Sequence, residues 1–136
     1  FVVWRNYDNF FNKIAPSNIV AWTFNEEFVD ALRTTEDLPD GIYVYEWSGR
    51  WPWGMEVQTL LLPDTPGEWR GEGAGNTDLT VDYSNGRPVF MLFHDYQQLL
   101  PEIQAKYPGG EVIVGPPFWE HPETTAYTIY VLPEQP

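Results

Sequence analysis

His94 and Asp95 form a neighbouring pair whose side chains could do acid–base chemistry. The pair follows the apolar run Val89–Phe93, and open α/β sheets bind ligands at the carboxyl ends of such strands. A histidine can act as a general base when a carboxylate orients its ring. However, no serine or cysteine elbow motif accompanies the pair, and Asp95 is well placed to cap the helix expected after it. The pattern therefore favours a cap at Asp95 and no catalytic residue, and leaves His94 as a candidate ligand-binding residue.

Tryptophans gather in the segment that follows the first expected strand. Trp47, Trp51 and Trp53 lie there among glycine and proline residues. Exposed aromatic side chains at this density are typical of an interface with a sugar ring or with another protein. The competing interpretation is that these rings fold back and form a small core beneath the loop. We take Trp47, Trp51 and Trp53 as candidate ligand-binding residues and keep both interpretations open.

Two other segments carry weaker signals for a ligand. The glycine-rich stretch Gly71–Asn76 lacks the Lys-Ser/Thr pair of a phosphate loop, and its Glu72 would repel phosphate. His121 lies near Glu120 and Glu123, but a metal site needs about three or four converging ligands, and the chain has two histidines and no cysteine. We therefore expect a plain loop, no metal and no cofactor.

The charge balance is strongly acidic. Twenty Asp and Glu residues face seven Lys and Arg residues, which gives a formal net charge of −13. Because phosphate backbones require a basic face, nucleic acid is not an expected partner, and anionic lipid is disfavoured on the same ground. Acidic residues are so common that pairs such as Glu26–Glu27 are weak evidence for glycoside chemistry. The absence of cysteine excludes disulfides and thiol catalysis.

The elements that must position these residues are centred on the segment from Val89 to Val114. A buried strand at Val89–Phe93 is followed by a helix with the apolar stripe Leu99, Leu100, Ile103 and Tyr107. Pro108-Gly109-Gly110 ends that helix, and Val112–Val114 begins the next strand. This order predicts a β–α–β unit whose right-handed crossover makes the two strands a parallel pair.

The remaining segments complete an α/β pattern. We expect helices at 24–35, opened by a capping box at Thr23, and at Met55–Leu62; strands are expected at Ile42–Glu46, Glu68–Gly71, Leu79–Tyr83 and Ala126–Leu132. No helical stretch separates the last strand from Val112–Val114, so this pair should be antiparallel. The sequence predicts a single-domain α/β sandwich, with a mostly parallel sheet flanked by helices and an antiparallel last strand.

The amino-terminal segment has a different character. Residues 1–18 form an aromatic stem in which an amphipathic helix is expected, and residues 19–136 form the single α/β domain. The stem either caps the core or lies at a membrane surface, where Trp and Tyr are favoured. Because the chain begins with Phe1, we expect a fragment or a processed chain. No apolar run is long enough for a transmembrane helix.

The order of these motifs resembles a known class of domain. The segments Arg87–Leu92, Leu99–Gly110 and Ala126–Pro133 carry the resemblance, which extends over nearly the whole chain. The chain resembles the soluble C-terminal domain of multi-spanning membrane glycosyltransferases similar to dolichyl-phosphate-mannose protein mannosyltransferases. The resemblance implies a domain on the extracytoplasmic face, tethered by an upstream transmembrane region. In such enzymes the catalytic acid lies in the membrane part, so no catalytic residue is carried over.

The resemblance therefore implies a non-catalytic accessory domain that acts as a lid, an acceptor-binding surface or a stabilising cap. Its expected partners are the membrane-spanning part of the same polypeptide and a glycan or protein acceptor. The alternative is a free-standing carbohydrate- or protein-binding module that uses the loop Trp47–Trp53. A third interpretation is a small enzyme centred on His94 and Asp95.

Overall fold

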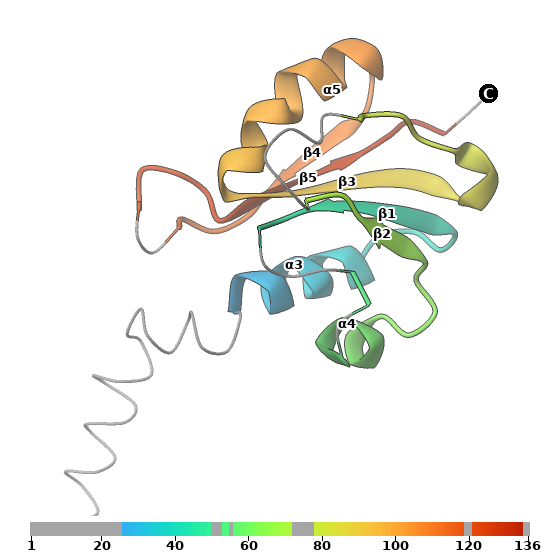
Figure 1. The fold of residues 1–136 in the computed structure, drawn as a ribbon, viewed down its shortest axis with the longest axis horizontal. Coiled ribbons are helices and arrows are strands. Elements are labelled where there is room, and N and C mark those ends of the chain that lie inside the picture. The colour runs from blue at the N-terminus through green and yellow to red at the C-terminus, as the bar shows by residue number, and fades with distance from the viewer. Residues whose placement is uncertain (1–25, 50–52, 55, 72–77, 119–120, 135–136) are drawn as a thin grey trace, which may run out of the picture.

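The chain forms a single α/β domain built on a five-stranded mixed sheet (Figure 1). The computed structural model describes residues 26–49, 53–54, 56–71, 78–118 and 121–134. The expectations for the stem at 1–18, the capping box at Thr23, the tryptophan Trp51 and most of the glycine-rich loop lie outside these residues. The sheet has the order β2-β1-β3-β5-β4. Its strands are β1 (Ile42–Trp47), β2 (Gly67–Trp69), β3 (Arg87–Phe93), β4 (Glu111–Val114) and β5 (Tyr127–Val131).

Strand directions in the sheet follow the predicted pattern. β1 is parallel to both β2 and β3, whereas β5 is antiparallel to β3 and to β4. β4 therefore runs in the same direction as the first three strands, and only β5 is reversed among the strands of this sheet. The predicted mostly parallel sheet with an antiparallel last strand is confirmed.

β3 occupies the centre of the sheet because its side chains are apolar on both faces. Every residue from Pro88 to Phe93 is buried, as expected for a strand covered on both sides. Val89, Met91 and Phe93 belong to one core cluster, while Phe90 and Leu92 belong to the other. The two clusters lie on opposite faces of the sheet.

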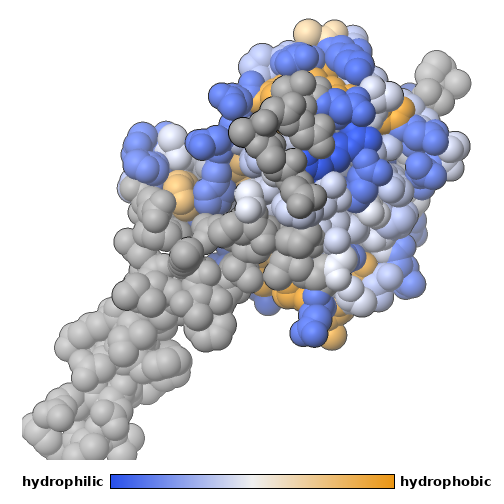
Figure 2. All heavy atoms as spheres, in the orientation of Figure 1, coloured by the Kyte–Doolittle hydropathy of each residue, from blue (hydrophilic) through white to orange (hydrophobic). Residues whose placement is uncertain are grey.

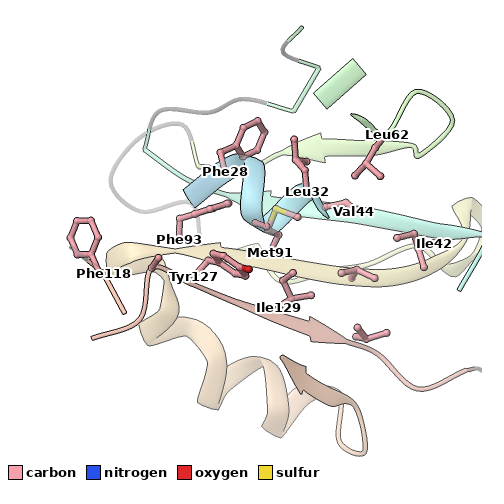
Figure 3. Close-up of a cluster of buried hydrophobic side chains, with 14 residues drawn as sticks. Phe28, Leu32, Ile42, Val44, Leu62, Met91, Phe93, Phe118, Tyr127 and Ile129 are labelled. Carbon is pink, nitrogen blue, oxygen red and sulfur yellow. The ribbon is translucent and has the colours of Figure 1, made fainter. Parts of the chain in front are cut away.

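The helices α3 (Glu26–Glu36) and α4 (Glu56–Leu61) cover the first face (Figure 1). α3 buries Phe28, Ala31 and Leu32, which recur at helical spacing. Phe28 and Leu32 belong to the same cluster of buried side chains as Met91 of the sheet (Figure 3). Each such side chain stabilises the fold by about 1.5–3 kcal/mol through burial.

The opposite face is covered by a 3-10 helix, η3 (His94–Leu99), that continues directly into α5 (Leu100–Lys106). Ile103 of α5 is fully buried, and the rest of the predicted stripe packs around it. The predicted core-facing stripe is therefore confirmed. The ring of Trp47 stacks on Phe90 beneath this layer, with ring centroids 5.3 Å apart.

β3 and β4 run in the same direction, as predicted, but the prediction that they pair with each other is wrong. β5 lies between them and pairs with both. Every residue of β5 is buried, whereas Glu111, Val112 and Val114 of β4 are exposed. An interior position shields both faces and both edges of a strand, so the more apolar β5 occupies it and β4 is left at the edge.

The predicted strand at Leu79–Tyr83 is also wrong, because side chains occupy the backbone groups that a sheet would use. Arg70 Nη1 donates to the carbonyls of Asp78 (2.8 Å) and Thr80 (2.6 Å). The hydroxyl of Tyr107 donates to the Leu79 carbonyl at 2.9 Å. The segment is an extended loop that buries Leu79, and the short 3-10 helix η2 (Tyr83–Asn85) follows it.

The surface is largely polar, as expected for an acidic chain. On the side of the molecule drawn in Figure 2, the described residues are mostly hydrophilic, with small scattered apolar patches. Within the described part of the chain, no helix has both the length and the apolar character needed to span a membrane.

Candidate functional site

A hollow of about 330 Å³ lies where β3 ends and η3 begins. This is the carboxyl end of the central strand, the place where open α/β sheets commonly bind ligands. Polar side chains from η3 and from the segment before β5 surround one aromatic ring. The described residues that line the hollow are His94, Asp95, Gln97, Phe118, His121, Thr124 and Thr125.

Contacts with two side chains and one backbone group fix the position of His94 in the hollow. Its Nε2 lies 2.7 Å from Oε2 of Glu27, which belongs to the first turn of α3. Its ring lies 4.5 Å from the ring of Phe118, at an interplanar angle of 60°. The backbone N–H of His94 also donates to the Ala126 carbonyl at 3.3 Å. The predicted ligand-binding residue therefore lies in a hollow, and its ring orientation is fixed by a carboxylate.

The backbone at His94 is unusual. Its φ is +49°, and among the described residues it is the only one other than glycine with a positive φ. The left-handed conformation costs an L-residue roughly 1–2 kcal/mol. Strain of this kind persists where surrounding contacts over-determine it, and it is concentrated at ligand clamps and active sites. Here the conformation turns the chain sharply from β3 into η3 and places the imidazole against Glu27.

Glu27 contributes a carboxylate that is only partly satisfied. The residue is 9% exposed. Its Oε2 contacts His94, whereas its Oε1 is buried and meets no hydrogen-bond partner among the described residues. A buried acceptor without a donor is costly, roughly 1–3 kcal/mol. This pairing spans 67 positions of sequence, so no local motif signals it.

Asp95 does not cap the helix, contrary to the expectation from sequence. η3 begins one residue earlier, at His94, and its N-cap position is Phe93, where no side-chain cap hydrogen bond is made. Asp95 instead lies exposed in the first turn, at the rim of the hollow. No hydrogen bond or ion pair joins its carboxylate to another residue of the described part. The carboxylate partner of His94 is therefore Glu27, and Asp95 remains available at the rim.

Gln97 builds the rigid wall of the hollow. Its Nε2 donates to the Thr125 carbonyl at 2.7 Å. Its Oε1 accepts from the hydroxyls of Thr125 and Thr128, each at 2.6 Å. These bonds tie η3 to β5 and to the segment before it, and they leave the Thr125 hydroxyl proton already engaged.

His121 lies at the open side of the hollow. Its Nδ1 is 3.3 Å from Glu123 Oε1, and both side chains are largely exposed. An exposed pair of this kind contributes little to stability. Across the described ranges, no three His, Cys, Asp or Glu side chains converge in a way that could hold a metal ion.

The tryptophan loop does not present the surface expected from sequence. Trp47 is fully buried and stacked on Phe90, so its ring has no face to offer a ligand. The alternation of Tyr43, Tyr45 and Trp47 along β1 could have indicated this, since Tyr45 and Trp47 share one face. Trp53 is partly buried against the other core. The observed position of Trp47 agrees with the interpretation that its ring belongs to the core. Trp47 is therefore not available as a contact residue in a free-standing binding module.

Glu46 is a buried carboxyl that the sequence reasoning missed. It is fully buried on β1, and burial raises its pKa to about 8. The Ser48 side chain and the Trp53 backbone act in the opposite direction and lower that pKa, although neither Glu46 oxygen makes a full hydrogen bond to a described residue. Side chains alternate along a strand, so Glu46 lies on the same face of β1 as the buried Ile42 and Val44. This spacing could have predicted from the sequence that Glu46 is buried. Glu46 is not among the residues lining the hollow.

No protein-family model, no curated protein and no solved structure matches this chain.

Proposed function

We propose that this chain is a non-catalytic accessory domain of a membrane-embedded glycosyltransferase that uses a lipid-linked sugar. Its role is to bind the acceptor at the hollow beside His94. The observation that carries this proposal is the state of the hydroxyls around the hollow. Thr124 Oγ1 donates to the His121 carbonyl at 2.9 Å, and Thr125 Oγ1 donates to Gln97. These hydroxyls are already engaged in bonds within the framework, so the hollow suits binding better than group transfer.

The residues that carry the family resemblance support the proposed acceptor-binding role, because they pack together into the scaffold of the hollow. The Gly110 N–H donates to the hydroxyl of Tyr130 at 2.9 Å, and that hydroxyl donates to the Tyr107 carbonyl at 2.7 Å. These bonds fasten the end of α5 to β5. The segments Leu99–Gly110 and β5 thus form the scaffold that holds the hollow in shape.

The proposal places the domain on the extracytoplasmic face, tethered by an upstream transmembrane region. Its partners are that membrane-spanning part and a glycan or protein acceptor. The strongly negative charge is compatible with this position, because an acidic surface is not drawn onto anionic lipid and stays solvated beside the membrane.

The coding sequence upstream of Phe1 tests the proposal. We expect several apolar segments of about 20 residues each, the length that crosses a bilayer, together with an acidic residue in a loop between them. An upstream sequence without apolar spans would overturn the assignment to a membrane glycosyltransferase.

A further inference from the structure

We infer that the hollow beside His94 binds a neutral, hydroxyl-rich ligand of the size of a sugar ring, and that Asp95 is its principal polar contact. The inference deepens the proposed acceptor-binding role and rests on it for biological context. Its physical basis is independent of the parent protein, because it uses only groups of this domain that lie in or beside the hollow.

The available polar groups favour hydroxyl donors. The Asp95 carboxylate at the rim is unengaged by described residues. Ionised carboxylates only accept hydrogen bonds, and bonds to them are about twice as strong as neutral ones. A ligand that carries several hydroxyl groups on a small ring can donate to Asp95 from more than one of them. Sugar rings have this combination.

The charge of the surroundings disfavours an anionic ligand. Asp95 lies at the rim, Glu27 lies behind His94, and Glu123 pairs with His121 at the open side. Phosphate or a carboxylate would meet the Asp95 carboxylate, and no arginine or lysine is among the described residues that line the hollow. The ligand is therefore expected to carry no negative charge.

The size and rigidity of the hollow also fit a small ring. Its volume of about 330 Å³ lies at the lower end of the roughly 300–1,000 Å³ that small-molecule sites occupy. The Gln97 bonds to Thr125 and Thr128 fix one wall, and the strained His94 backbone fixes another. A wall that is ordered before binding loses little entropy when the ligand enters.

Amide-resolved NMR titration of the chain with methyl α-D-mannopyranoside, D-glucose, inorganic phosphate and methylammonium tests the inference. We expect at least one neutral sugar to shift the amides of Asp95, Thr124 and Thr125, and phosphate to leave them unchanged. Asp95→Ala should weaken the sugar's binding about tenfold, a change of about 1.4 kcal/mol. The matched control Asp40→Ala, an exposed aspartate outside the hollow, should leave it unchanged.

Three results would overturn the inference: no shift at these amides with either sugar, a response to phosphate or methylammonium that exceeds the response to the sugars, or sugar binding that Asp95→Ala leaves intact. The amide spectrum of Asp95→Ala also reports whether the variant is folded. If it is not, Asp95→Asn, which keeps the shape and removes the charge, serves in its place with the same expected loss. Failure here would leave the upstream-span test of the proposed function untouched, so the two can be distinguished.

Discussion

Nε2 of His94 lies 2.7 Å from Oε2 of Glu27, and this contact joins the end of the central strand to the first turn of α3. The contact lies behind the hollow. Because His94 occupies a strained backbone conformation, the Glu27 carboxylate also helps to keep this residue in that conformation. It holds the imidazole where the ligand is expected to meet it.

Removing that carboxylate should destabilise the domain. Glu27→Ala is expected to lower the free energy of unfolding by about 0.5–1.5 kcal/mol, because the substitution loses the bond to His94 but also removes the unsatisfied Oε1. Urea unfolding followed by tryptophan fluorescence measures this. Glu26→Ala is the matched control, because Glu26 is exposed on the same helical turn, and it should change stability by less than about 0.5 kcal/mol. Equal effects of the two substitutions would contradict the role given to Glu27.

The backbone strain at His94 can be measured by comparing two substitutions that both remove the imidazole. His94→Gly and His94→Ala lose the same contact with Glu27, but glycine adopts a positive φ without a steric cost. We expect the glycine variant to be more stable than the alanine variant by about 1 kcal/mol. Chemical denaturation of both proteins gives the difference. An alanine variant as stable as the glycine variant would show that the left-handed conformation is not retained in solution.

Glu46 should give the protein a distinct dependence of stability on pH. Burial raises its pKa from 4.5 to about 8 in the folded chain, so the folded state retains a proton that the unfolded state releases. The contribution of Glu46 is therefore complete below about pH 4.5, declines as the pH rises toward about 8, and is constant above that. At about 1.36 kcal/mol per pKa unit, the total decline is at most about 5 kcal/mol.

Glu46→Gln removes this titration. Its stability should exceed that of the natural chain by a margin that grows from pH 5 to about pH 8 and then stops growing. Thermal or urea unfolding across this range provides the measurement. Glu56→Gln, at an exposed position of α4, should leave the original pH profile unchanged. A margin for Glu46→Gln that is flat with pH would contradict a protonated, buried Glu46.

Gly110 tests the packing role of the helix-terminating motif. A Cβ there would lie 2.5 Å from Tyr130 Cζ and 2.6 Å from the Val131 carbonyl oxygen. Gly110→Ala should therefore destabilise the domain by about 1–3 kcal/mol, as overpacking does. Gly49→Ala is the control, because nothing lies within 4 Å of its added Cβ. If Gly110→Ala were as stable as Gly49→Ala, the close fit between the end of α5 and β5 would be refuted.

Much of the fold follows from local patterns in the sequence. The all-apolar run of β3 and the stripe on α5 are predicted correctly, since periodicity and burial agree at these positions. The relative position of β4 and β5 is not local information. It depends on whether β4 or β5 buries more apolar surface in an interior position of the sheet. A β–α–β pattern alone does not compare the burial of these two strands.

The candidate site is only partly visible in the sequence. His94 is signalled by its place after a buried strand, but its partner Glu27 is 67 residues away. Asp95 lies one residue too late to cap η3. The residue at which a helix begins cannot be read from the sequence to within one or two positions. The loop at Leu79–Tyr83 alternates like a strand, yet its backbone groups bond to the side chains of Arg70, Tyr107 and Tyr45.

Steady-state glycosyl transfer by the proposed parent glycosyltransferase, with its natural Asp95 and with Asp95→Ala, is the sharpest test of the proposed acceptor-binding role. An accessory domain that binds the acceptor predicts that the substitution raises the KM for the acceptor and leaves kcat unchanged, because Asp95 takes no part in bond making. A fall in kcat with an unchanged KM would contradict the claim, since it would place Asp95 in the chemical step.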